Sequence, residues 1–164
     1  MMKRYKKHIA CLATAMAMTF ASCDSGYDCS LENIAYNHIG FYITNEYGGD
    51  VSYTHPDAIT VSLMVNGRDS IVVNHIQGTK QLTLPMSYTQ ECDTVILSYS
   101  NDVTDTLYVR HSNIPFYQSM ECGVIMHHKL LGTSHTDNFI DSVAITNADI
   151  NFGNNENIKI YFIE

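Results

Sequence analysis

The fold is decided by residues 59–67, which read Ile59-Thr60-Val61-Ser62-Leu63-Met64-Val65-Asn66-Gly67. Ile59, Val61, Leu63 and Val65 stand at every second position, and this period of two predicts a half-buried β-strand. The Asn-Gly pair that follows predicts a tight hairpin turn, because both residues accept a positive φ. The stretch therefore indicates a β-sheet protein with short connections.

The same period recurs after residue 30, where no 3.6-residue period is sustained. Turn residues separate the apolar runs, and we expect Pro85 and Pro115 at strand ends or sheet edges. We predict an all-β fold, one antiparallel β-sandwich over residues 31–164, Ig-like or transthyretin-like, with about nine or ten short strands. Regular alternation covers 39–43, 59–65, 95–99, 106–110 and 158–162, and less regular runs cover 70–76, 80–84, 114–120, 122–131 and 139–148.

An Asp-Ser/Thr pair followed by apolar residues occurs four times, starting at Asp69, Asp93, Asp105 and Asp141. Aspartate side chains accept hydrogen bonds from the amides of nearby turns. We predict that each pair marks the start of a strand, with its carboxylate bonded to amides of the turn before the chain enters the sheet.

Residues 1–22 have the three parts of a secretory signal peptide. Four basic residues lie in the first seven positions, an apolar run of 12 residues follows at 9–20, and two small residues precede Cys23. A run of 12 is too short to span a bilayer, which takes about 20 residues. Residues 20–23, Phe-Ala-Ser-Cys, resemble the lipobox of bacterial lipoproteins, which implies that Cys23 carries the acyl chains of a stable membrane anchor. Residues 23–30 are then the lipidated cysteine and a polar tether.

The predicted mature chain is strongly acidic. All 17 acidic residues follow the signal peptide but only five basic residues do, which gives a net charge of −12 with neutral histidines. So few cations cannot neutralise a run of phosphates, which argues against a nucleic-acid partner. We expect the protein in the cell envelope, anchored at the outer membrane and facing the periplasm or the outside. Its partner there, a protein or a glycan, stays open.

Four segments resemble a family of uncharacterised Bacteroidota lipoproteins. They are Asp28-x-Cys, IPFYQSMECG at 114–123, NFIDSV at 138–143 and NENIKIYF at 155–162. The likeness covers most of residues 28–163 and is densest after residue 104. It implies a small exported β domain tethered to a membrane. The family has no established activity, so the resemblance assigns no catalytic residue.

The secretory signal places the domain in an oxidising compartment, where thiols pair. Cys11 leaves with the signal and Cys23 carries lipid, so Cys29, Cys92 and Cys122 remain, with three possible pairings. We predict a disulfide between Cys29 and Cys122. A bridge at Cys29 would hold the start of the folded region, and both cysteines lie in segments that resemble the family. Cys92 lies in a polar turn and is expected to stay unpaired.

The histidines invite a metal site, which the sequence does not favour. His127 and His128 are adjacent and would face opposite sides of a strand, so they cannot bind one ion together. His127 and His135 can meet across a loop, but no third ligand has a recognised spacing. Residues 149–156 superficially resemble a calcium loop, but their glycine and glutamate are not at the positions that an EF-hand requires.

No sequence motif indicates a catalytic site or a cofactor. The sequence favours a non-enzymatic binding or structural accessory module of the envelope, whose ligand is unknown. The alternatives are a divalent-ion or glycan-binding surface lipoprotein and a hydrolase with an unrecognised site. The tyrosines of the mature chain could line a glycan or peptide surface, but we expect most of them at half-buried strand positions.

Overall fold

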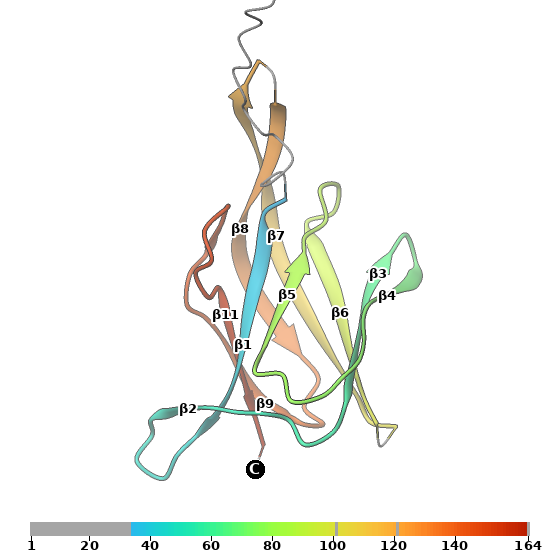
Figure 1. Ribbon diagram of the computed structural model, residues 1–164, viewed down its shortest axis with the longest axis vertical. Coiled ribbons are helices and arrows are strands. Elements are labelled where there is room, and N and C mark those ends of the chain that lie inside the picture. The colour runs from blue at the N-terminus through green and yellow to red at the C-terminus, as the bar shows by residue number, and fades with distance from the viewer. Residues whose placement is uncertain (1–33, 101, 121, 164) are drawn as a thin grey trace, which may run out of the picture.

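The computed structural model describes residues 34–100, 102–120 and 122–163, where every regular element is a β-strand. Eleven strands form two sheets (Figure 1), which confirms the predicted all-β sandwich. The strands are β1 (Tyr36–Thr44), β2 (Asp50–Ser52), β3 (Ile59–Val65), β4 (Arg68–Ile76), β5 (Gln81–Pro85), β6 (Cys92–Tyr99), β7 (Thr104–Ser119), β8 (Gly123–His135), β9 (Ile140–Ile145), β10 (Asp149–Ile150) and β11 (Ile158–Phe162).

The two sheets differ in size and in the direction of one strand pair. The first has the order β2-β1-β11-β9, and β5 pairs with the part of β1 that precedes the β2 pairing. The second has the order β10-β8-β7-β6-β3-β4. Neighbouring strands run antiparallel except β1 and β11, which run parallel from Ile39↔Ile158 to Tyr42↔Tyr161. Parallel neighbours need a long connection, and these two are the first and last of the described strands.

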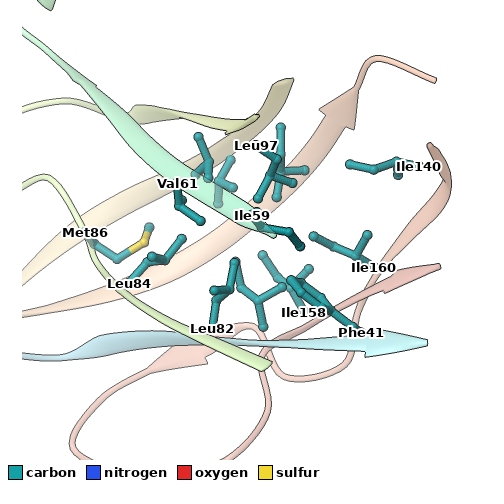
Figure 2. Close-up of a cluster of buried hydrophobic side chains, with 14 of the residues drawn as sticks. Phe41, Ile59, Val61, Leu82, Leu84, Met86, Leu97, Ile140, Ile158 and Ile160 are labelled. Carbon is teal, nitrogen blue, oxygen red and sulfur yellow. The ribbon is translucent and has the colours of Figure 1, made fainter. Parts of the chain in front are cut away.

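The core lies between the two sheets (Figure 2). Ile59, Val61 and Leu97 point into it from the second sheet, and Phe41 and Ile160 point into it from the first. Each of these five side chains is at most 1 % exposed. Burial of one such side chain contributes about 1.5–3 kcal/mol to stability. The period of two in the sequence is therefore the pattern of side chains that the core buries.

Most strands lie where the sequence predicts them. The Asn66-Gly67 turn joins β3 and β4 with φ values of 51° and 74°, as expected for a tight hairpin. The runs at 106–110 and 114–120 differ from the expectation, because they form one strand of 16 residues, β7. Strands β2 and β10 were not predicted, since three and two residues are too short to show a period.

The four predicted strand starts are confirmed in position, because each aspartate is the second residue of a strand. Asp105 accepts hydrogen bonds from the N–H groups of Asn138 (2.9 Å) and Phe139 (2.8 Å), in the segment between β8 and β9. Asp93 accepts one from the N–H of Ser87 at 3.0 Å. The Asp93 carboxylate thus bonds the loop just before its own strand, as predicted, whereas the Asp105 carboxylate bonds a loop from elsewhere in the chain.

Candidate functional site

The β7–β8 hairpin extends beyond the body of the sandwich (Figure 1). Strand β6 accompanies β7 only as far as Arg110, which pairs with Cys92. In the described part of the chain, the outer edges beyond that point are met only by a backbone hydrogen bond from His111 to Glu91, by β10 beside the middle of β8, and by a single bridge between Ile34 and Met126. The outer third of the hairpin is therefore a two-stranded ribbon that projects from the domain.

The end of this ribbon is apolar and exposed. We call Ile114, Phe116, Tyr117, Met120 and Val124 the hairpin tip; their side chains are between 45 % and 91 % exposed. Phe116 and Tyr117 are neighbours on one strand, so their rings lie on opposite faces of the ribbon. Gathered exposed apolar side chains are typical of an interaction surface. The tip presents such a surface on both of its faces.

The tip is also nearly free of charge. Residues 112–126 contain one charged residue, Glu121, although 16 % of the whole chain is charged. The surface that the hairpin presents is thus apolar and close to neutral on an acidic protein.

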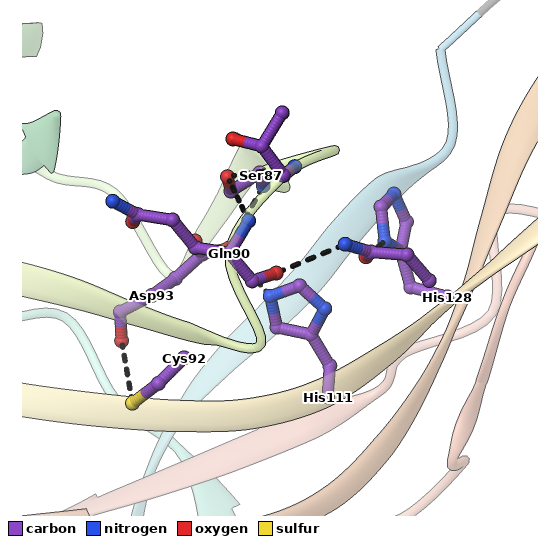
Figure 3. Close-up of polar contacts among 8 residues, drawn as sticks. Ser87, Gln90, Cys92, Asp93, His111 and His128 are labelled. Atoms are coloured by element: carbon purple, nitrogen blue, oxygen red, sulfur yellow. Dashed lines mark hydrogen bonds and ion pairs between the residues drawn. The ribbon is translucent and has the colours of Figure 1, made fainter. Parts of the chain in front are cut away.

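A buried polar group lies at the base of the projecting ribbon (Figure 3). Asn113 donates from Nδ2 to the backbone oxygen of Gln90 at 2.9 Å. Its Oδ1 is 2.7 Å from Nδ1 of His128, which pairs with it across the ladder. Because the amide nitrogen of Asn113 is used by Gln90, its oxygen faces the imidazole, and His128 donates from Nδ1. The residues of this stem cluster are Ser87, Gln90, Asp93, His111, Asn113 and His128.

The other half of the stem cluster joins Asp93 to His111. Oδ2 of Asp93 lies 3.3 Å from Nε2 of His111 and also accepts from the N–H of Ser87. The backbone N–H of His111 donates to the oxygen of Glu91 at 2.9 Å. These contacts, with that of Asn113, bind the loop between β5 and β6 to the hairpin. The stem cluster therefore fixes the direction in which the ribbon projects.

His128 is held neutral in this position. Its burial is the main cause that lowers its pKa from 6.5 to about 4, and a positive charge on His111, whose ring centroid is 5.3 Å away, acts in the same direction. Its ring also stacks on Tyr88, with centroids 5.8 Å apart. At neutral pH the imidazole is a hydrogen-bond donor and packing group within the stem.

Among the described residues, no contact joins the Ser87 hydroxyl or the Cys92 thiol to a histidine of the stem cluster; Oγ of Ser87 accepts from the N–H of Gln90 at 3.1 Å. Cys92 is adjacent to Asp93 on β6, so the thiol and the carboxylate face opposite sides of the sheet, and Cys92 points away from His111 (Figure 3). Among the described residues, no three His, Cys, Asp or Glu side chains are placed to hold a metal ion. What the cluster does in this geometry is position the ribbon.

The histidines that the sequence singled out lie on one strand. His127 stacks on Phe116 with centroids 4.9 Å apart, whereas His128 faces the stem cluster, so the prediction of opposite faces is confirmed. The expectation that His127 and His135 can meet across a loop was wrong. Both belong to β8 and are eight residues apart, about 26 Å along an extended strand.

The residues of the candidate calcium loop point in different directions. Oδ1 of Asn151 accepts from the N–H of Gly153 at 2.8 Å, which closes a local turn. Oε2 of Glu156 accepts from the hydroxyl of Tyr42 on β1 at 2.9 Å. This hydrogen bond is the first cause of a raised pKa of Tyr42. The Glu156 carboxylate is thus bound to the first sheet rather than turned toward Asp149.

The cysteine predictions are only partly within reach of the structure. Cys92 is an exposed free cysteine and Cys122, beside the tip, is disulfide-bonded. Cys23 and Cys29 lie outside the described residues, so the lipid site and the pairing of Cys29 with Cys122 stay predictions.

The tyrosines are more exposed than expected. Of the nine in the described residues, Tyr99 is buried and three are half-buried, but five are exposed, so the expectation that most occupy half-buried positions was wrong. The exposed ones are Tyr36, Tyr47, Tyr88, Tyr108 and Tyr117.

The exposed hairpin tip was not predicted from the sequence. The feature of the sequence that could have indicated it is the near absence of charged residues over 112–126.

Comparison with known proteins places the chain by family only. The model of a family of unknown function, DUF6452, matches residues 58–162. No curated protein and no solved structure matches the chain. The matched region runs from β3 to β11 and includes the stem cluster and the hairpin tip. The chain therefore belongs to the DUF6452 family of unknown function.

Proposed function

We propose that this protein is a lipid-anchored lipoprotein of the bacterial cell envelope and a non-enzymatic binding module, with the hairpin tip as its contact surface. The observation that carries the binding role is the projection of five exposed apolar side chains on a ribbon that the stem cluster holds in place. Exposed apolar patches favour aggregation, so five such side chains in water would be a disadvantage unless they bind a partner.

The anchor is supported by the sequence. Basic residues, an apolar run and small residues precede Cys23 in the order of a lipoprotein signal, and the segments quoted above resemble Bacteroidota lipoproteins. The described residues include no helix that is long and apolar enough to cross a membrane. An acylated Cys23 would hold the domain at the outer membrane, facing the periplasm or the outside.

The non-enzymatic role is supported by the shape of the surface. Four depressions between the described residues have volumes of about 190–280 Å³, below the roughly 300–1,000 Å³ that is usual for small-molecule sites. The one that adjoins the tip is lined by Tyr88, Cys122, Val124, Ile125 and Met126, none of which is a carboxylate or a histidine. This surface is better suited to contact with a large partner than to a reaction on a small one.

The anchor is tested by Cys23→Ala with Cys92→Ala as the matched control. We expect the Cys23 variant to leave the membrane fraction after a salt wash while it remains folded, and the Cys92 variant to stay there with the wild type. Retention of the Cys23 variant in washed membranes would contradict lipid anchoring.

The contact surface is tested by a photo-crosslinking amino acid at Tyr117 or at Tyr108. Both positions lie on β7 and are exposed, but Tyr117 is in the tip and Tyr108 on the body of the sheet. In intact cells we expect a cross-linked product, with protein or lipid, from position 117 and none from position 108. Equal labelling at both positions would refute the tip as the contact surface.

A further inference from the structure

We propose that the hairpin tip rests in the lipid–water interface of the membrane that carries Cys23, so that the domain contacts this membrane at two points. The inference rests on the proposed function, because it takes the lipid anchor as given, and it names the partner of the same tip.

The first argument is where the chain enters the domain. Ile34, the first described residue, bridges Met126 near the end of the hairpin. Ten residues separate it from Cys23, so an extended chain reaches at most about 40 Å. The predicted bridge between Cys29 and Cys122 would shorten this path to six residues, about 21 Å. The acyl chains are therefore tethered to the tip end of the domain.

The second argument is that the tip is apolar on both faces. The five residues at 114–118 are all exposed, although they alternate between the two sides of the ribbon. A flat protein surface would cover one face and leave the other in water. Lipid surrounds whatever enters it and covers both.

The third argument is charge. The predicted mature chain has a net charge of −12, so most of its surface is repelled by anionic headgroups at distances within about a Debye length. Residues 112–126 contain a single acidic residue. The tip is the part of the tethered end that can approach such a surface.

The backbone limits how deep the tip can enter. The outer edges of the ribbon carry N–H and C=O groups with no partner strand among the described residues beyond the Ile34 bridge. Such groups are costly in hydrocarbon, where no water can satisfy them. The tip therefore enters only the headgroup–acyl boundary, about 5–10 Å deep, where phenylalanine and tyrosine side chains are accommodated.

The experiment uses the absence of tryptophan from this chain, since one introduced indole then reports a single position. Met120→Trp places it in the tip, at a side chain that is 91 % exposed. The matched control is Tyr47→Trp, at a side chain that is 94 % exposed in the turn after β1, at the opposite end of the molecule (Figure 1). The full-length lipidated protein is reconstituted into phosphatidylcholine vesicles with and without brominated acyl chains.

We expect the Met120→Trp emission to shift to shorter wavelength in vesicles and to be quenched by the brominated lipids, and the Tyr47→Trp emission to do neither. An unshifted, unquenched Met120→Trp signal would place the tip in water and refute the proposal. A shifted signal without quenching would place the tip against protein, such as a second copy of the chain, and would also refute it.

Co-flotation of the wild-type protein separates this result from the proposed anchor. A protein that floats with the vesicles but leaves the Met120→Trp indole unquenched overturns the tip contact alone. A lipidated preparation that fails to float overturns the anchor, and the two-point contact with it.

Discussion

Nδ1 of His128 lies 2.7 Å from Oδ1 of Asn113, its partner across the β7–β8 ladder, at the point where the hairpin leaves the sandwich. The same asparagine bonds Gln90, in the loop between β5 and β6. One side chain thus connects both strands of the hairpin to the body of the domain, and the projecting ribbon depends on it for a fixed direction.

Asn113→Ala should loosen the ribbon more than it destabilises the fold. The substitution leaves the Nδ1–H of His128 and the oxygen of Gln90 without their present partners, at a cost of about 2–3 kcal/mol. In hydrogen exchange, the amides of residues 112–127 should lose protection while those of β3 and β6 keep theirs. Gln118→Ala, at an exposed position of the same hairpin, is the control and should change neither. Unaltered exchange in the Asn113 variant would contradict a positioning role.

The free energy of unfolding should decrease as the pH is lowered, because the folded protein holds His128 neutral. Its folded pKa of about 4 lies below the ordinary value of 6.5, so its contribution is present above pH 6.5 and is lost as the pH falls toward 4. At 1.36 kcal/mol per unit, and with allowance for partial solvent screening, the loss is about 2 kcal/mol. This loss can be measured by urea titrations between pH 7.5 and pH 4, which is roughly the span over which His128 changes its charge.

His128→Gln should flatten that pH dependence, whereas His135→Gln, on the same strand, should not. A residual slope is expected in the His128 variant, because burial also lowers the pKa of His55. If the wild type and the His128 variant lose stability in parallel from pH 6.5 downward, another group is responsible.

Asp105 should be among the most sensitive positions of the fold. Its side chain is fully buried and accepts from Asn138 N–H, Phe139 N–H, the Thr136 hydroxyl and the Tyr99 hydroxyl, at 2.8–3.3 Å. Asp105→Ala leaves these donors unsatisfied and should cost about 3–5 kcal/mol in chemical unfolding.

Asp141→Ala is the matched control. Asp141 occupies the same place in the recurring motif, but among the described residues its carboxylate accepts a hydrogen bond only from the hydroxyl of Ser142, at the surface. Its stability should stay within about 0.5 kcal/mol of the wild type. Equal losses in the two variants would mean that the motif, and not the buried contacts, sets the cost.

The strands were predictable because a core that lies on one side of each sheet imposes the period of two. Residues 59–65 coincide with β3, and the alternation at 158–162 coincides with β11. The parallel pairing of β1 with β11 was not predictable, because no local pattern shows which strands become neighbours after a long connection.

The candidate site was not predicted, because its apolar side chains are not buried on one side of a sheet and show no period of two. At residues 114–118 the apolar side chains are exposed on both faces, so the run is irregular, and an interpretation that equates apolar with buried yields an ordinary inner strand. The stem cluster is a tertiary feature. The motif singled out Asp93, but its contact with His111 forms only when β6 and β7 align in register.

Gly40 should tolerate no side chain while Glu156 keeps its place. A Cβ at residue 40 would overlap the Glu156 carboxylate and the edge of the Tyr42 ring. Gly40→Ala should therefore cost about 1–3 kcal/mol, as overpacking does. The double variant with Glu156→Ala should lose less than the sum of the two single losses, by about 1 kcal/mol, because one clash is removed. Strict additivity in unfolding experiments would show that the carboxylate is not what excludes a larger residue.

The last prediction concerns the covalent link between the tether and the hairpin. Non-reducing peptide maps should join Cys29 to Cys122, and Cys92, which is free and exposed, should react with a thiol reagent without prior reduction. The bridge would close a loop of 93 residues, which by chain entropy stabilises the fold by roughly 4.6 kcal/mol, with less expected in practice. Reduction or Cys29→Ser should lower the melting temperature, whereas Cys92→Ser should leave it unchanged. A map that joins Cys92 to either cysteine would overturn the pairing, and with it the short path from the acyl chains to the hairpin tip.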